Sequence, residues 1–287
     1  MRDQNLDRME RIEGKFAEEE KVKEMEKFLK TIAEKLREEG VPVDDDCRIN
    51  PNSFRKLCSK EEIEDMERDA KRINRYKSDP KWTPEEQKNK RDGEKLEMFK
   101  TAIFNKFLKD KFIVVRSSQK DDVDNGVDNV IIEKETGNIV SAFDEVTTFN
   151  YDDNQNDPRY EKKANNVIGK NKNGVSIEYG FSVDKNKKIQ LIKDIKNIPI
   201  FYLALPQKKL EEGIMNFKPD SISKCEENFF NFFIGNIIIQ MKSLESRKDI
   251  NLECQNKLKL FKESLVGLLK EPLKTILEKE FSRNVPK

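Results

Sequence analysis

The chain has 287 residues, of which 35% are hydrophobic and 39% are charged, and its formal net charge at pH 7 is +1. Because the charge is balanced, attraction of the whole protein to nucleic acid or to a membrane surface is not expected, and only local basic patches can provide it. The sequence contains no histidine, which excludes Ser-His-Asp and Cys-His catalysis and the common zinc sites built on histidine. The abundant carboxylates suit Mg²⁺ or Mn²⁺ instead.

Cysteine usage and hydropathy indicate a cytoplasmic protein. The four cysteines form no Cys-x-x-Cys pair, and no signal peptide is expected before them. We therefore expect free thiols in a reducing compartment. The most apolar run, 229–241, is interrupted by polar residues and is too short to span a bilayer, so no membrane association is predicted.

The first 92 residues are predicted to form a helical N-terminal extension. Apolar residues at helical spacing indicate one long helix over 1–39, which ends at Gly40. Such a helix is typical of a coiled-coil arm or of a packing helix, and it is the candidate surface for a protein partner. Ser59 and Glu62 then form a capping box at the start of a second helix.

A core domain is predicted over 93–206, because the pattern changes there from helical to alternating. A helix over 93–109 precedes the strands. The expected strands and the second helix, in chain order, are 112–116, 127–132, 139–146, the helix 158–168, then 175–183, 189–192 and 198–205. The strands 112–116, 127–132, 139–146 and 198–205 should share one sheet, with the first helix against one of its faces.

A helical C-terminal region is predicted over 207–287 and should pack on the core. Its first long helix carries Phe229, Phe233, Ile237 and Met241 at helical spacing, and these side chains are expected to be buried. A further helix over 258–277 is expected, with a kink at Pro272. The fold class is therefore α+β, a small mixed sheet with helical N- and C-terminal extensions.

The order of the core elements resembles the PD-(D/E)XK nuclease superfamily, in which a helix is followed by three antiparallel strands, a second helix and another strand. Asp128, in Gly126-Val127-Asp128-Asn129, stands where that family has its first metal-binding carboxylate. Phe143-Asp144-Glu145-Val146 stands where its (D/E)-x-K triplet belongs. The resemblance implies a restriction-endonuclease-like sheet. The same two segments also resemble an uncharacterised bacterial family, which implies no activity.

The resemblance implies a site for Mg²⁺ or Mn²⁺ built from Asp128 and either Asp144 or Glu145. Glu97, or Glu94, on the preceding helix is the candidate for an additional acid. Adjacent strand residues point to opposite faces, so only one of Asp144 and Glu145 can join Asp128. Two or more hard oxygen ligands on rigid strands are what a hydrated Mg²⁺ needs.

The sequence departs from the family at the lysine of the triplet, because Val146 or Thr147 stands in its place. Lys162 or Lys163, on the next helix, is the candidate to replace it. The implied activity is metal-dependent cleavage or binding of nucleic acid. The alternative is a non-catalytic protein that docks a partner through its amphipathic helices. An enzyme acting on a small nucleotide is disfavoured because no Gly-rich phosphate loop is present.

Overall fold

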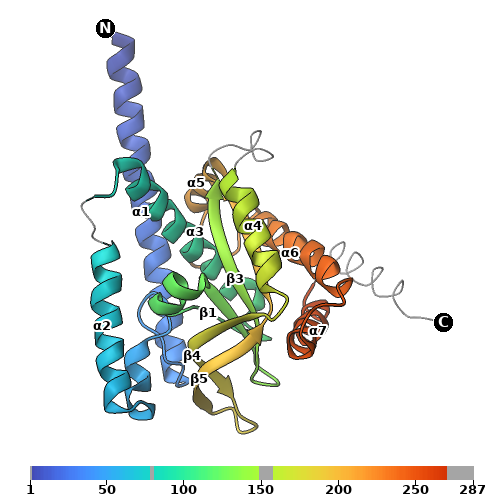
Figure 1. The fold of residues 1–287 in the computed structure, drawn as a ribbon. Coiled ribbons are helices and arrows are strands. Elements are labelled where there is room, and N and C mark those ends of the chain that lie inside the picture. The colour runs from blue at the N-terminus through green and yellow to red at the C-terminus, as the bar shows by residue number, and fades with distance from the viewer. Residues whose placement is uncertain (1, 78–80, 149–157, 270–287) are drawn as a thin grey trace, which may run out of the picture.

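The computed structural model describes residues 2–77, 81–148 and 158–269, and Figure 1 shows helices arranged around a small sheet. The expected α+β class is confirmed. The helices are α1 (Arg2–Glu38), α2 (Lys60–Lys77), α3 (Pro84–Leu108), α4 (Pro158–Lys170), α5 (Gln207–Met215), α6 (Lys224–Glu245) and α7 (Leu252–Val266). The strands are β1 (Phe112–Arg116), β2 (Asn129–Glu133), β3 (Ile139–Thr148), β4 (Val175–Val183), β5 (Ile189–Ile198) and β6 (Ile200–Pro206).

Four strands form the central sheet in the order β1-β2-β3-β6, which confirms the predicted grouping. The strands β1, β2 and β3 are antiparallel neighbours, whereas β6 lies parallel to β3, with Glu145 opposite Leu203. A parallel neighbour requires a crossover connection, and α4 lies in that connection. The remaining strands, β4 and β5, pair as a separate two-stranded sheet.

Helix α3 packs against one face of the central sheet. The ring of Phe104 on α3 lies 5.7 Å from the ring of Phe143 on β3 and 5.9 Å from that of Phe233 on α6. Phe261 on α7 contacts Phe112 and Phe201. Aromatic side chains therefore join the sheet to the C-terminal helices. Burial of such a side chain removes a large apolar area from water and stabilises the fold by about 1.5–3 kcal/mol.

The predicted burial in the C-terminal region is confirmed. Phe229, Phe233, Ile237 and Met241 lie on one face of α6, and all four are buried. The capping box predicted at the start of α2 is also present, because the N–H of Ser59 donates to Glu62 and the N–H of Glu62 donates to the hydroxyl of Ser59.

The long N-terminal helix packs on the body of the protein through its second half. Met25, Leu29 and Ala33, spaced by four residues, are completely buried, and the ring of Phe28 contacts that of Phe217. The first half of α1 extends beyond the other elements in Figure 1, and Phe16 on it is 63% exposed. Among the residues of α1 whose side chains are described, those of the second half contribute to the core.

Several boundaries differ from the sequence predictions. Helix α3 begins at Pro84 and continues through 92–93, so the predicted domain boundary falls inside a helix. A glycine inside a helix is less favourable than alanine by about 1 kcal/mol, and this cost is too small for Gly93 to end the helix. Strand β2 begins at Asn129, and β5 extends to Ile198. The proposed kink at Pro272 lies outside the described residues. Within those residues no helix is long and apolar enough to cross a membrane.

Candidate metal centre

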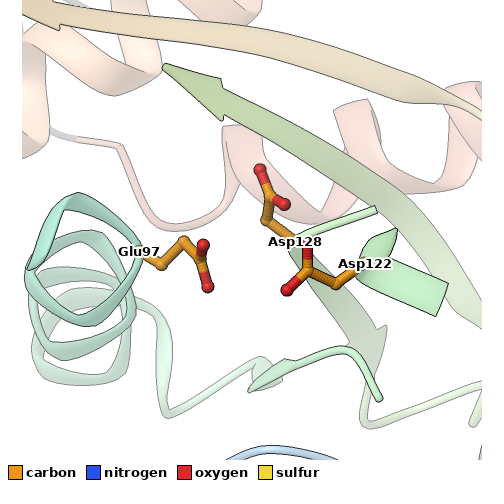
Figure 2. A group of neighbouring side chains, drawn as sticks. All are labelled: Glu97, Asp122 and Asp128. Carbon is orange, nitrogen blue, oxygen red and sulfur yellow. The ribbon is translucent and has the colours of Figure 1, made fainter. Parts of the chain in front are cut away.

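Three carboxylates from three different elements converge beside the central sheet. Glu97 projects from α3, Asp122 from a π-helical turn (Asp121–Asn125), and Asp128 from the segment just before β2. Figure 2 shows Glu97 reaching across from its helix toward the two aspartates. One oxygen of each carboxylate lies within 4.8 Å of an oxygen of the other two. Among the described residues, this is the group with the spacing of a metal site.

The backbone around Gly126 holds Asp128 in place. Gly126 ends the π-helical turn with a left-handed φ of 58°, a conformation that glycine adopts without steric cost. The backbone N–H of Asp128 donates to the carbonyl of Phe143 at 2.8 Å, which ties the segment to β3. Asp128 is therefore fixed at the start of β2 by a turn on one side and a strand on the other.

Glu145 on β3 faces the same side as Asp128. Its backbone N–H donates to Asp128 Oδ2 at 2.5 Å, and its carboxylate accepts a hydrogen bond of 3.3 Å from Asn129 Nδ2. Its carboxylate also forms an ion pair with Lys100 on α3, and both side chains are essentially inaccessible to solvent. The ammonium group of Lys100 lies 4.1 Å from the centre of the Phe143 ring, so it is enclosed by the sheet and its own helix.

Two arginines bind Glu97. Its Oε2 accepts hydrogen bonds of 2.5 Å from Arg116 and 3.0 Å from Arg48. Arg48 also lies 3.3 Å from Asp122 Oδ2. Burial on its own raises the pKa of Glu97, but the charges of Arg116 and Arg48 outweigh it and hold this pKa below its usual value. Glu97 is therefore ionised at neutral pH.

Asp128 lies in the opposite electrostatic environment. Burial raises its pKa well above the usual value, and the negative charges of Glu145 and Glu97 raise it further. Burial also raises the pKa of Glu145, although Lys100 opposes that shift. A carboxyl group beside other acids in a low-dielectric site ionises only when a cation compensates it. Asp128 is thus the group in this cluster that a bound cation stabilises most.

Asp144 points to the other face of β3, as strand alternation requires. A β-carbon built on Gly126 would lie 3.7 Å from Asp144 Oδ2 and 2.9 Å from the ammonium nitrogen of Lys170. Lys170, at the end of α4, donates to the carbonyl of Asn125 at 2.8 Å. Asp144 therefore borders the glycine turn together with a lysine from α4, and Glu145 is the β3 carboxylate on the side of Asp128.

The lysine beside these carboxylates is Lys100, which the sequence reasoning did not name. Lys162 is exposed on α4, and the side chain of Lys163 lies outside the described residues. Thr147 occupies the triplet position on the face of Glu145 and carries no basic group. A sequence signal for Lys100 does exist, because it falls on the buried face of α3, one turn after Leu96. A lysine on an apolar helix face is unusual unless it is paired.

The carboxylates have the chemistry of a site for Mg²⁺ or Mn²⁺. Two oxygens that bind one Mg²⁺ at about 2.1 Å are separated by at most about 4.2 Å. The oxygens of Glu97, Asp122 and Asp128 lie within 4.8 Å of one another, which is close to that limit. These three residues are the candidate ligand set, with Glu145 behind them through its hydrogen bond to Asp128.

Comparison with known proteins leaves the site to be interpreted from its own geometry. No protein-family model matches the chain, and neither a curated protein nor a solved structure matches it.

Proposed function

We propose that this protein is a divergent metal-dependent nuclease-like phosphodiesterase with a core of the PD-(D/E)XK, restriction-endonuclease-like type. The order of elements supports this assignment, since α3 is followed by three antiparallel strands, then α4, then a strand parallel to β3. Asp128 precedes the second strand, and Glu145 lies on the third. The β4–β5 hairpin between α4 and the last strand is an addition to that order.

Glu97, Asp122 and Asp128 would hold Mg²⁺ or Mn²⁺, and Glu145 would support Asp128 through its backbone N–H. A bound divalent cation supplies a nucleophilic water at neutral pH and offsets the charge of the phosphorane-like transition state. Lys100 takes the role that the triplet lysine has in the family. Its ion pair with Glu145 beneath the Phe143 ring would hold that carboxylate next to Asp128, from α3 rather than from the strand.

The observation that carries the proposal is the burial of Asp128 among other acids. Like charges brought together in a low-dielectric interior destabilise the fold unless a cation compensates them. Asp128 is only 8% exposed, and the neighbouring charges of Glu145 and Glu97 both raise its pKa. Arg48 and Arg116 compensate Glu97, and Lys100 compensates Glu145, so Asp128 is the buried acid that a metal ion would compensate.

A nicking assay with a matched pair of aspartate variants tests the proposal. Purified protein should cleave DNA or RNA in the presence of Mn²⁺, and Asp128→Asn should abolish the cleavage. Asp144→Asn removes the same charge from the opposite face of β3 and should retain most of it. Cleavage that survives in Asp128→Asn, or that is lost equally in both variants, would argue against this site.

The alternative function is that of a non-catalytic protein that docks a partner through α1. The observation that favours it is the first half of α1, which extends from the body (Figure 1) with Phe16 exposed. Metal binding without cleavage would favour this alternative and a degenerate site. Under either function, nucleic acid remains the candidate ligand of the core, and the helix remains the candidate surface for a protein partner.

A further inference from the structure

Arg48 contacts both the acidic cluster and a neighbouring pocket. Its guanidinium lies 3.0 Å from Glu97 Oε2 and 3.3 Å from Asp122 Oδ2, so it is bound to two of the three carboxylates of the candidate metal centre. The same residue lines a pocket of about 380 Å³ between the 44–55 segment, α2 and residues 119–120, just before the Asp121–Asn125 turn. Arg48 therefore forms the wall between the acids and the pocket.

Backbone hydrogen bonds fix the position of Arg48 between the acids and the pocket. The segment that carries it pairs with the edge strand β1, since Arg116 N–H donates to the carbonyl of Cys47 at 2.8 Å and Ile49 N–H donates to that of Arg116 at 2.9 Å. Cys47 has a left-handed φ of 56°, which is rare for a residue other than glycine. Asp44 Oδ1 accepts from the backbone N–H of Arg48 at 2.9 Å. The backbone is thus fixed, and the buried guanidinium donates to the carbonyl of Ser117 at 3.1 Å in addition to the two carboxylates.

The pocket offers surface for a nucleotide. Two of its acids are already paired, Glu67 with Arg55 at 2.9 Å and Asp69 with Lys120 at 2.6 Å. Apolar and aromatic surface comes from Ile49, Met66, Ile73 and Tyr179. A volume of about 380 Å³ lies in the range of small-molecule pockets and is far too small for a duplex. It suits one nucleotide unit of an unpaired strand, whose base needs an apolar surface.

A second feature of the cluster points to a ligand with acceptor oxygens. Arg116 is 4% exposed, and its Nε is a buried donor with no hydrogen-bond acceptor among the described residues. A buried donor without an acceptor costs about 1–3 kcal/mol. The same guanidinium binds Glu97, so this unused donor belongs to the group that faces the acids. A phosphate oxygen beside the acids would supply an acceptor.

We propose that Arg48 exchanges between these two places: it fills the cation site in the metal-free protein, and when Mg²⁺ or Mn²⁺ binds it turns to the pocket and holds a phosphate of an unpaired strand. This inference rests on the proposed function. The cation and the guanidinium compete for Glu97 and Asp122. Once the cation occupies the carboxylates, Arg48 loses two of its partners, and phosphate is an anion that a planar guanidinium binds through two parallel hydrogen bonds.

The proposed exchange predicts that Arg48 weakens metal binding and strengthens oligonucleotide binding, and Arg48→Gln tests both effects. Isothermal titration should show Mn²⁺ binding to Arg48→Gln about tenfold more tightly than to the wild type, because the competing charge is gone. In saturating Mn²⁺, the affinity for a single-stranded phosphorothioate oligonucleotide should fall about tenfold. A factor of ten corresponds to about 1.4 kcal/mol. Arg37→Gln, an arginine paired with Asp45 outside the pocket, should change neither affinity.

The outcomes separate this inference from the proposed function. Unchanged or weaker Mn²⁺ binding by Arg48→Gln, or tight binding of the matching duplex, overturns the exchange while the metal site stands. A wild-type protein that binds no Mn²⁺ overturns the proposed function itself. Should circular dichroism show that Arg48→Gln is unfolded, Arg48→Lys replaces it. A single ammonium group cannot contact Glu97 and Asp122 in the same two-armed way, so this variant should also bind Mn²⁺ more tightly than the wild type.

Discussion

Lys100 and Glu145 form an ion pair in the interior of the protein, where neither side chain is accessible to solvent. Burial lowers the pKa of Lys100, and the charge of Glu145 opposes that shift. An enclosed pair of this kind is weak evidence for stability by itself, because two charges must leave water to form it. Its presence on the face of Asp128 instead fits a role in the proposed site.

Removal of one partner of this pair should be costly. Lys100→Met leaves the Glu145 carboxylate buried without its cation, and the free energy of unfolding should fall by about 3–5 kcal/mol. The double variant Lys100→Met/Glu145→Leu should recover most of that loss, because an apolar pair replaces a charged one. Urea denaturation of the wild type, both single variants and the double variant measures this. A double variant less stable than Lys100→Met would contradict the account of the pair.

Phe232 and Phe233 are neighbours on α6 with opposite surroundings. Phe233 is completely buried and contacts Phe104, whereas Phe232 is 36% exposed. Phe233→Ala should lower the free energy of unfolding by about 3–5 kcal/mol through lost burial and a cavity. Phe232→Ala should cost about 1 kcal/mol or less. Equal losses in the two variants would mean that α6 does not pack as described.

Replacement of Gly126 and of Gly93 by alanine should change the free energy of unfolding in opposite directions. Gly126 has a φ of 58°, so Gly126→Ala should cost about 1–2 kcal/mol through backbone strain. Gly93 lies inside α3, and a β-carbon there would meet nothing within 4 Å. Gly93→Ala should therefore gain about 0.5–1 kcal/mol. Thermal melts of both variants measure the difference, and a stabilising Gly126→Ala would be inconsistent with the turn that holds Asp128.

Helix α2 is attached to β5 through an ion pair that depends on pH. Hydrogen bonds from Lys193, at 2.5 Å, and from the backbone N–H of Ser59 lower the pKa of Glu62 to about 2 from its ordinary 4.5. A depressed carboxyl pKa contributes stability above the ordinary pKa, and this contribution is lost as pH falls from about 4.5 toward 2. Glu62→Gln should therefore melt below the wild type at neutral pH, and the gap should narrow in acid.

The control for that experiment is Glu64→Gln, which removes the same charge from an exposed position on α2. Subtracting its effect corrects for the change in net charge. A gap between Glu62→Gln and the wild type that widens in acid would mean that the Lys193 contact does not form in solution.

Much of the fold was accessible from the sequence because the patterns there are local. Strand β1 and strand β4 have the predicted bounds, and Ser59 with Glu62 marks the start of α2 through capping. The predicted helix start at 93 was wrong because the helix begins at Pro84, and Gly93 weakens it without ending it. Periodicity reports which residues face a core, and it reports element ends less well.

The sequence predicted only part of the site, and the reason is physical. Asp128 directly precedes β2 and Glu145 lies on β3, its partner strand, so their proximity follows from the sheet. Lys100 and Arg48 reach the same place from a helix and from the N-terminal region, and tertiary packing alone brings them there. A sequence pattern cannot report contacts between residues that are far apart in the chain. The sequence therefore predicted a lysine on the next helix, α4, whereas the buried lysine beside Glu145 lies on α3.

The binding of Mn²⁺ to the folded protein tests the central claim most directly. A ligand that binds only the folded state stabilises it by about 2.7 kcal/mol at a free concentration one hundred times its dissociation constant. The melting temperature of the wild type should therefore rise with Mn²⁺, that of Asp128→Asn should not, and that of Asp144→Asn should rise as in the wild type. A wild-type melting temperature that Mn²⁺ and Mg²⁺ leave unchanged, or a rise that persists in Asp128→Asn, would contradict the proposed metal centre.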